Sequence, residues 1–351
     1  MVKRLVFAVP GDLTTPTGGY AYDRRIIAEL KTLGWNIDVI DLGDGYPRPD
    51  AATRAVAQEL LTKTPHGCPI VIDGLAFGVL QNTAAALYRS NPLIALVHHP
   101  LALESGLTPA DIEIFRASER AALKFVRRVI VTSPSTASLL AADYDISADR
   151  IVVARPGSDP VTPAVESRDG IVRLLAVGSL VPRKGYDVLL AALATLADLP
   201  WRLTVAGDKD RDRATVQEIE NDIACFKLSD RIALLGAVAP DRLGELYRTA
   251  DLFVLASRFE GYGMAYAEAL TYGLPTIGTK AGAVPDTLPG DAAILVEPGD
   301  VVALASALRR LISDKNERQR FSIAARAAAA RLPTWQDSAA LFANPIEAAI
   351  P

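Results

Sequence analysis

Cysteine and histidine are scarce in this chain. Its 351 residues include two cysteines, Cys68 and Cys225, and three histidines. The two cysteines lie far apart in the sequence and each has an apolar setting, so we expect two buried free thiols rather than a disulfide. The histidines and cysteines form no cluster along the sequence, which leaves no zinc-binding motif.

The chain also lacks a strong charge and a long apolar run. Its 37 Lys and Arg residues are set against 41 Asp and Glu, giving a formal net charge of −4. Because a dedicated nucleic-acid binder needs a basic surface, we expect no nucleic-acid partner. No segment reaches the ~20 apolar residues of a membrane-spanning helix. Residues 1–10 lack the length and the small-residue cleavage site of a signal peptide, so we predict a cytoplasmic protein.

The composition that remains is typical of a globular protein. Half of the residues are hydrophobic and 22% are charged, and the length allows two domains of ~150 residues each. Short apolar strands alternate with helices along the whole chain, which predicts an α/β fold with parallel sheets. The best linker is the proline-bearing, charged segment that ends near Asp169. We therefore expect a first domain at 1–160, a second at 161–334 and a terminal helix at 335–351.

The most informative stretch is residues 250–286. A short apolar strand at 252–255 is followed by a glycine-bearing loop and then by a helix that begins at Met264. The first N–H groups of a helix have no internal partner, and the helix dipole adds partial positive charge there, so such a loop can hold an anion. Gly261 and Gly263 would let a diphosphate approach the backbone closely.

Two glutamates flank this loop. Glu260 precedes the helix, and Glu268 lies about 7 Å beyond Gly263 along the helix axis, at ~1.5 Å per residue. Carboxylates accept hydrogen bonds from sugar hydroxyls, so the pair suits a nucleotide sugar, in which a diphosphate joins a ribose to a hexose. A pair of surface glutamates is the alternative. The apolar neighbours of Glu268, Ala267 and Leu270, disfavour that alternative because an unpaired charge among them is unfavourable.

The sequence here resembles a known family. Glu260-Gly261-Tyr262-Gly263-Met264, followed by Glu268-Ala269, resembles the Glu-x7-Glu signature of the retaining glycosyltransferases of family 4, which have the GT-B fold. The segment 282–286, Gly-Ala-Val-Pro-Asp, resembles that family's Gly-Gly-x-Pro-Glu segment. It departs from that pattern at Ala283, in place of the second glycine, and at Asp286, in place of the glutamate.

A second loop, residues 178–185, resembles the family's glycine loop with Arg and Lys around the donor diphosphate. Sugar transfer leaves a nucleoside diphosphate with growing negative charge. Arg183 can bind two phosphate oxygens, and Lys184 can supply a point charge. An Arg-Lys pair at a helix start is often only solvated. Cations are nevertheless unfavourable beside the positive end of a helix, so their position there indicates an anion between them.

The first domain offers two further candidates. Gly18-Gly19 follow the first strand, without a GxGxxG fingerprint, and alone they are also typical of a plain turn. His98 and His99 follow directly after the strand 93–97, where a histidine that only caps the sheet is the alternative. The resemblance implies that the glycine pair approaches the donor phosphates and the acceptor. It also implies that His98, rather than His99, contacts the transferred sugar.

Together the resemblance implies two Rossmann-like domains that face each other across a cleft. It implies transfer of a hexose from a UDP- or GDP-sugar to a lipid or saccharide acceptor, with retention at the anomeric carbon, in the synthesis of a cell-envelope glycan or glycolipid. The implied catalytic residues are His98, Glu260, Arg183 and Lys184. The expected substrate-binding residues are Gly18, Gly19, Gly178, Gly236, Val238, Gly261, Tyr262, Gly263, Met264, Ala265 and Glu268, with the backbone around Gly236 and Val238 facing the nucleotide base.

No metal and no cofactor are expected beside the nucleotide-sugar donor. Arg183, Lys184 and the helix N-terminus would do the work that a divalent ion does elsewhere. The sequence offers no Asp-x-Asp pair at a strand end to hold a metal on a diphosphate, since Asp208-Lys209-Asp210 carries a lysine between its carboxylates and is interpreted as a turn.

Three alternatives stay open from the sequence. A nucleotide-sugar epimerase can share this fold, and a non-catalytic subunit could bind the same nucleotide sugar. The helix expected at 107–128 is basic and amphipathic, so it could lie on the inner face of a membrane as a peripheral contact of the first domain. A solvated face, with Glu113 and Glu119 between the basic residues, is the more common explanation of such a pattern.

Overall fold

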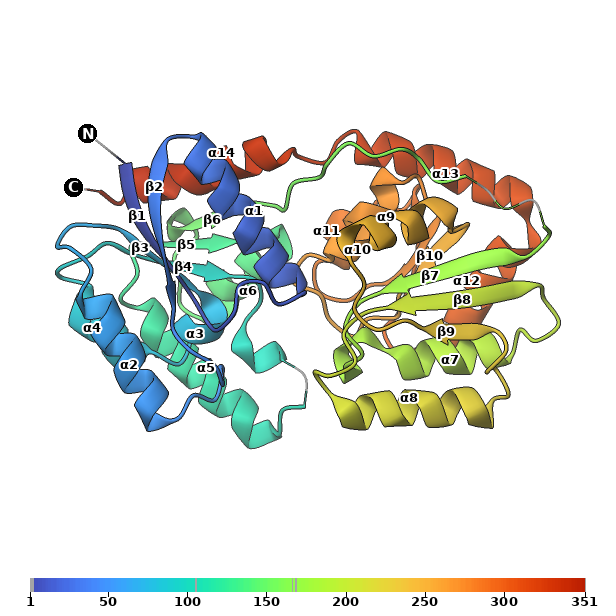
Figure 1. The fold of residues 1–351 in the computed structure, drawn as a ribbon, viewed down its shortest axis with the longest axis horizontal. Helices are drawn as coiled ribbons and strands as arrows, with labels where there is room; N and C mark the ends of the chain where they lie inside the picture. The colour runs from blue at the N-terminus through green and yellow to red at the C-terminus, as the bar shows by residue number, and fades with distance from the viewer. Residues whose placement is uncertain (1–2, 105, 166, 168, 351) are drawn as a thin grey trace. The chain divides into compact units, whose positions relative to one another are not determined.

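The computed structural model of the chain describes residues 3–104, 106–165, 167 and 169–350. The chain divides into two compact units. The first unit comprises Met1–Gly157 and Pro333–Pro351, and the second comprises Ser158–Leu332. Both contain a parallel sheet with helices around it (Figure 1).

The first unit is built on a six-stranded sheet in the order β2-β1-β3-β4-β5-β6. Its paired strands all run parallel. The strands are β1 (Lys3–Val9), β2 (Trp35–Asp41), β3 (Ile70–Asp73), β4 (Leu93–Val97), β5 (Arg128–Val131) and β6 (Ile151–Val153). The helices are α1 (Gly18–Thr32), α2 (Ala51–Thr62), α3 (Gly74–Phe77), α4 (Gln81–Leu87), α5 (Pro109–Leu123), α6 (Pro134–Asp143) and α14 (Trp335–Glu347), with 3₁₀ turns η1 (Leu101–Leu103) and η2 (Ala148–Arg150).

The two central strands β3 and β4 bring polar residues to one edge of this sheet. Both strands are buried along their whole length, as parallel strands covered on both faces are. Asp73 is the last residue of β3, and His98 directly follows β4. Since the carboxyl ends of parallel strands meet at the same edge, these two side chains emerge together.

Helix α14 belongs to the first unit although it follows the second unit in the sequence. Phe342 stacks on Phe7 of β1 with ring centroids 6.1 Å apart. The ring centroids of Trp335 and of Tyr22 in α1 are 6.0 Å apart. A side chain at Gly157 would clash with the backbone of Trp335, so this close approach requires a glycine. The helix ends at Glu347, and Pro351 lies outside the described residues.

The second unit holds another six-stranded parallel sheet, in the order β12-β11-β10-β7-β8-β9. Its strands are β7 (Val172–Val177), β8 (Trp201–Ala206), β9 (Ile232–Leu234), β10 (Leu252–Val254), β11 (Thr276–Thr279) and β12 (Ala293–Val296). Its helices are α7 (Tyr186–Ala194), α8 (Arg213–Cys225), α9 (Pro240–Thr249), α10 (Met264–Thr271), α11 (Val284–Thr287), α12 (Val301–Ser313) and α13 (Lys315–Ala329), with a 3₁₀ turn η3 (Pro182–Lys184).

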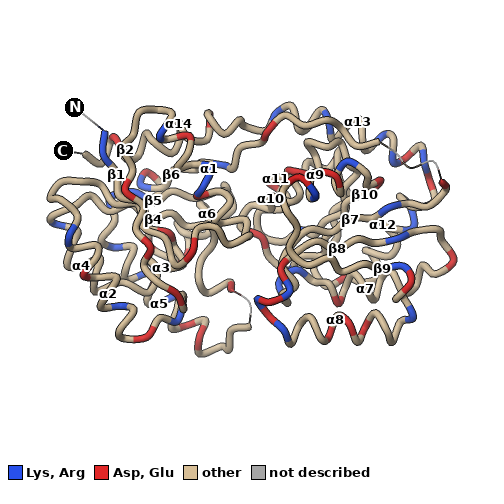
Figure 2. Tube along the Cα trace, in the orientation of Figure 1, with Lys and Arg blue, Asp and Glu red and all other residues tan. Residues whose placement is uncertain are grey.

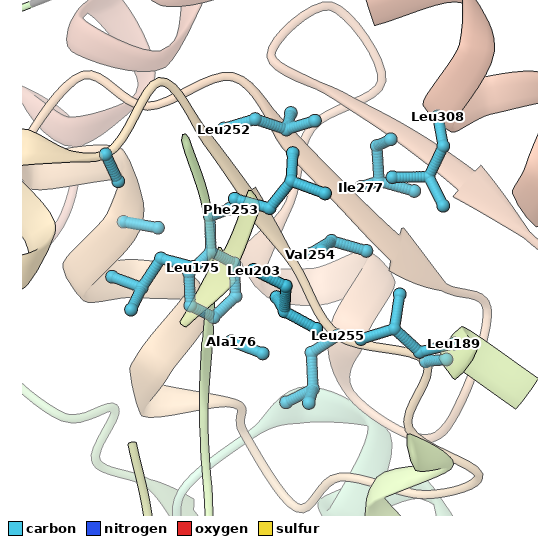
Figure 3. Close-up of a cluster of buried hydrophobic side chains, with 14 of the residues drawn as sticks. Leu175, Ala176, Leu189, Leu203, Leu252, Phe253, Val254, Leu255, Ile277 and Leu308 are labelled. Carbon is cyan, nitrogen blue, oxygen red and sulfur yellow. The ribbon is translucent and has the colours of Figure 1, made fainter. Parts of the chain in front are cut away.

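Strand β10 lies in the middle of the second sheet, between β7 and β11. Its apolar side chains form a core with those of neighbouring strands and helices, including Leu175, Leu203, Ile277 and Leu308 (Figure 3). Each Å² of apolar surface that this core buries contributes ~25 cal/mol to folding. The core therefore stabilises β10 and fixes the point from which the following loop starts.

Two expectations about single side chains are wrong, one for Cys225 and one for Glu119 of the basic helix. Cys68 is buried, but Cys225 is exposed. Helix α8 buries the face that carries Thr215, Ile219 and Ile223, and Cys225 falls off that face at the helix end.

The basic helix is shorter than expected and differs in its charges. It begins at Pro109 and ends at Leu123, so Arg127 lies beyond it, and the Arg127 guanidinium donates to the Ala349 carbonyl at 2.7 Å. Figure 2 shows charges of both signs along α5. Glu119, which we expected on a solvated face, is buried. Its Oε2 accepts the Leu101 N–H at 3.0 Å, and this hydrogen bond partly compensates the carboxyl group for its burial. None of the helices in the described ranges is long and apolar enough to span a membrane.

Candidate active site

Glu260 is the centre of the candidate donor site in the second unit. It lies in the loop between β10 and α10 and is only 5% exposed. Its Oε1 accepts from Lys184 Nζ at 2.7 Å and from Ser257 Oγ at 2.6 Å. Its Oε2 accepts from the Arg183 guanidinium at 3.2 Å. Three predicted site residues, from two loops that lie far apart in the sequence, thus form one hydrogen-bonded group.

The charges of this group hold one another in their ionised forms. Burial alone would raise the pKa of Glu260, but the adjacent Lys184 and Arg183 charges outweigh it and lower that pKa to about 2. Burial lowers the pKa of Lys184, and the Glu260 carboxylate opposes that shift. Two cations and one carboxylate leave an excess of one positive charge. Nε of Arg183 is buried without a hydrogen-bond partner among the described residues, which is unfavourable for a charged group.

Backbone contacts tie the loop of Arg183 to the loop of Glu260. The Arg258 N–H donates to the Arg183 carbonyl at 2.7 Å, and the Arg258 guanidinium binds both carboxylate oxygens of Asp187. Gly185 has a φ of 65°, and a Cβ there would clash with the Ala256 carbonyl. A Cβ at Gly178 would lie 3.0 Å from the Lys184 side chain. These glycines therefore let the two loops and the lysine side chain pack closely.

The helix that the sequence predicts after the glycine loop is present as α10, and its start is the part that we expect to bind an anion. Gly263 caps α10 in the left-handed region, with a φ of 89°, which favours glycine. The N–H groups of Met264 and Ala265 open the helix, where no intrahelical acceptor exists. Tyr262 and Gly261 precede them in a buried loop whose Tyr262 carbonyl accepts from Thr287 Oγ1 at 2.6 Å.

The segment that departs from the family pattern supports this same loop. The Ala283 N–H donates to the Glu260 carbonyl at 2.8 Å, and Ala283 has an ordinary φ of −88°. A backbone donor with that φ does not require glycine, so the alanine is compatible with the contact. Gly282 does need to be glycine, because a Cβ there would clash with the Glu260 carbonyl.

Glu268 has a partner that the sequence did not reveal. The Tyr247 hydroxyl donates to Glu268 Oε2 at 2.8 Å, and the Tyr247 ring stacks on Tyr272 with centroids 5.1 Å apart. Burial raises the pKa of Glu268, and the hydrogen bond from Tyr247 opposes the shift. No sequence signal could have found Tyr247, which lies on the preceding helix α9.

The two residues predicted to face the base follow β9. The Gly236 carbonyl accepts the Gly207 N–H at 2.9 Å. A Cβ at Gly207 would clash with the Gly178 carbonyl, so the loops that follow β7, β8 and β9 are in contact at the carboxyl edge of the sheet. Gly236 and Val238 are both partly exposed.

The candidate residues of the first unit form a separate group around His98. Its Nε2 lies 3.2 Å from Asp23 Oδ1 and 3.3 Å from Asp73 Oδ2. Both aspartates are buried. Burial would lower the pKa of His98, but the two carboxylates outweigh it and raise that pKa to about 10. Burial raises the pKa of Asp23 to about 6, and the imidazole opposes that shift.

The glycine pair and the second histidine take different places. Gly18 begins α1, and a Cβ at Gly19 would lie 3.4 Å from the His98 ring, so Gly19 packs against that ring. His99 Nε2 instead pairs with Glu104 at 2.8 Å. Sequence reasoning missed Asp23 and Asp73. Asp73, at the end of a predicted strand next to that of His98, carried a usable signal.

Within the described ranges, Asp23, Asp73 and His98 are the one group of three or more His, Cys, Asp or Glu side chains whose ligand atoms all lie within 4.8 Å of one another. The contacts among them satisfy the ring Nε2 without any further group.

The chain is similar to known sugar-transferring enzymes. Residues 164–328 match the family model described as "Glycosyl transferases group 1". The chain is 28% identical over 349 residues to the MMP alpha-(1->4)-mannosyltransferase of Mycolicibacterium hassiacum, an alignment that covers 92% of this chain and 81% of that protein.

Solved structures share the fold over nearly the whole chain. Sucrose-phosphate synthase from Thermosynechococcus elongatus superposes with a TM-score of 0.84 at 21% identity, covering 99% of this chain and 98% of that one. HepE from Anabaena in complex with UDP-glucose gives a TM-score of 0.78 at 17% identity, covering 98% and 99%. The chain is a glycosyltransferase with the GT-B fold, and its residues 164–328 match the glycosyl transferases group 1.

Proposed function

We propose that this glycosyltransferase moves a hexose from a UDP- or GDP-sugar to a lipid or saccharide acceptor, with retention at the anomeric carbon. The observation that carries the proposal is the group of Arg183, Lys184 and Glu260 beside the N-terminus of α10. It combines an excess positive charge for a diphosphate with a fixed carboxylate for sugar hydroxyls.

The donor diphosphate would accept hydrogen bonds from Arg183, from Lys184 and from the first N–H groups of α10. These donors are fixed before the reaction, so they stabilise the charge that develops on the leaving diphosphate without reorganisation. Glu260 would accept from hydroxyls of the hexose, and Glu268 from those of the ribose. In a front-face reaction the leaving phosphate oxygen takes the proton of the acceptor hydroxyl, so no protein nucleophile is required.

We propose that the reaction needs no metal. Two cations, Arg183 and Lys184, lie within hydrogen-bond distance of Glu260, and they would neutralise the diphosphate in place of a divalent ion. Positive charge supplied by side chains replaces the electrostatic part of metal catalysis.

A lipid acceptor would bring the first unit to a membrane surface at the cytoplasmic side, and α5 is the element we propose for that contact. Ile114 is 63% exposed on it. Two of its arginines are already paired, Arg116 with Glu113 and Arg120 with Asp145, so the attraction would come from Ile114 and Lys124 more than from a basic face. Sedimentation with anionic vesicles, using Ile114→Glu as the variant, tests this contact.

The proposed function is tested in two steps. A thermal-shift screen of UDP- and GDP-sugars identifies the donor, because a ligand of the folded state raises stability by RT ln(1 + [L]/Kd). Incubation with that donor and candidate acceptors, followed by NMR of the product, then reports the anomeric configuration. A product with inverted configuration, or stabilisation by no nucleotide sugar, would overturn the proposal.

A further inference from the structure

His98 is held on several sides by residues of the first unit. Asp23 of α1 and Asp73 at the end of β3 both face the same ring atom, Nε2, at 3.2 and 3.3 Å. Tyr22 meets the ring edge-on with centroids 5.4 Å apart, and Gly19 packs against the ring. The Thr132 hydroxyl donates to the His98 backbone carbonyl at 3.4 Å. The imidazole therefore has little freedom to turn.

This arrangement leaves only one nitrogen of the ring for a ligand. Nε2 faces the buried carboxylates, and its proton has two acceptors there. The described residues provide no hydrogen bond to Nδ1, and the His98 side chain is 20% exposed. One imidazole proton is thus held toward the protein, and the second is left for a group outside it.

The carboxylates also fix which protons the ring carries. A neutral imidazole with its proton on Nε2 would leave Nδ1 as an acceptor, whereas the imidazolium makes both nitrogens donors. Two carboxylates within ~4 Å favour the charged ring. Asp23 Oδ2 is buried with no partner among the described residues, and the neighbouring Asp73 carboxylate raises the pKa of Asp23 further, so the imidazole is the group that favours the charged form of Asp23. Tyr22 is a further titratable group against the ring, and its hydroxyl donates to the Ala154 carbonyl at 2.9 Å.

We propose that Asp23 and Asp73 are positioning residues that hold His98 as an imidazolium with Nδ1–H directed to the substrate. His98 then acts as a fixed hydrogen-bond donor to a hydroxyl or phosphate oxygen of the bound substrates, and it does not act as a general base. The part of this proposal that concerns the substrate rests on the proposed function. The part that concerns the ring and its two carboxylates does not.

The ring itself is tested by ¹⁵N NMR of the histidine side chains in the full chain. Only three histidines are present, so His98→Gln assigns the signals of His98 directly. We expect both ring nitrogens of His98 to be protonated at pH 7.5 in the absence of substrate. In Asp23→Asn the pKa of His98 should fall by about 1 to 3 pH units, the range for loss of one adjacent charge. Asp73→Asn should shift it in the same direction.

Glu119→Gln is the matched control, because it also removes a buried carboxyl of the first unit but does not touch His98. It should leave the His98 signals and their titration unchanged. A His98 ring that is neutral at pH 7.5 in the unmodified protein, or that titrates alike in Asp23→Asn, would overturn the proposal that Asp23 and Asp73 keep His98 charged. Binding of Zn²⁺ or Mn²⁺ that shifts the His98 signals, and reversal by EDTA, would assign the group to a cation and overturn it as well.

Kinetics then test the role toward substrate. Asp23→Asn should lower kcat by about 10- to 100-fold with a smaller change in donor KM, because a misplaced donor near the reacting atoms loses the benefit of orientation. A general base would instead give a kcat that falls at low pH with the pKa of His98, an outcome that contradicts a fixed donor. If the NMR result holds but no nucleotide sugar is consumed, the role of Asp23 and Asp73 in keeping His98 charged is supported and the proposed function fails.

Discussion

Replacing Glu260 with glutamine separates the two tasks that meet at this residue. Glu260 is expected to hold the hexose, and Arg183 and Lys184 the diphosphate, yet in the structure both cations donate to the Glu260 carboxylate. In the free protein the carboxylate thus occupies donors that the diphosphate needs. The glutamine variant keeps the size and one acceptor oxygen but removes the negative charge. We therefore expect it to bind the free nucleoside diphosphate more tightly while it transfers sugar more slowly.

The size of the first effect follows from the geometry. Lys184 Nζ lies 2.7 Å from the Glu260 carboxylate, so a phosphate oxygen on the other side of the ammonium would lie about 5 Å from that carboxylate. Two unit charges at ~5 Å repel by about 3 kcal/mol at an effective dielectric constant of ~20. Part of this is offset because glutamine holds the two cations in place less firmly before the diphosphate binds. A net gain of about 1–2 kcal/mol, or about 5- to 30-fold in Kd, is expected.

Calorimetry with UDP and GDP measures the binding, and initial rates with the nucleotide sugar measure the transfer. We expect kcat to fall by about 100-fold, as loss of an orienting contact at the reacting sugar does. Asp187→Asn is the matched control, because Asp187 pairs with Arg258 on the same loops but does not contact either donor-site cation. Weaker binding of the diphosphate by Glu260→Gln, comparable to that of Arg183→Ala, would refute the reasoning.

Four further outcomes are expected. Arg183→Ala should weaken nucleoside diphosphate binding by about 1.5–3 kcal/mol in calorimetry, the range for hydrogen bonds to charged groups; unchanged affinity would contradict its role. Glu268→Gln should mainly raise the donor KM, since its contact is the same in ground and transition states, and Tyr247→Phe should do so less; a loss confined to kcat would count against a ribose contact. Sugar transfer should persist in EDTA; loss that Mg²⁺ or Mn²⁺ restores would show a metal requirement. The pKa of Glu260 is lowered from 4.5 to about 2, so its ionised form adds stability that is fully present above pH ~4.5 and is lost as the pH falls towards 2. Denaturant unfolding at pH 5 and at pH 3 should therefore show a smaller loss of unfolding free energy in Glu260→Gln than in the unmodified protein.

The sequence predicted those parts of the fold that have local signals. The apolar run of β10, the glycine loop and helix α10 are all found where the pattern indicated them, because burial and helix capping are decided within a few residues. The GT-B fold is confirmed as well. Predictions that depended on packing were less secure. Cys225 and Glu119 each lie in an amphipathic helix, and which face of it is buried depends on neighbours that the pattern does not name.

The hydrogen-bond partners of the candidate residues could not be predicted in this way. Tyr247 reaches Glu268 from another helix, and Asp23 reaches His98 over a separation of 75 positions. Neither pair has a spacing that a secondary-structure period would flag. These contacts depend on how helices α9 and α10 pack together and on how α1 packs beside the end of β4, which the sequence pattern does not show.

The two groups share one electrostatic design with opposite signs. In the second unit a buried carboxylate lies between two cations, and in the first unit an imidazole lies between two buried carboxylates. A buried group with unequal numbers of opposite charges is unfavourable, because desolvation exceeds what incomplete pairing returns. A bound anion would relieve the excess positive charge around Glu260. Around His98 the excess is negative, so the ring is kept charged and its free N–H remains a donor. On the proposed roles, this unfavourable balance in the free protein would prepare one side chain of each group for a ligand.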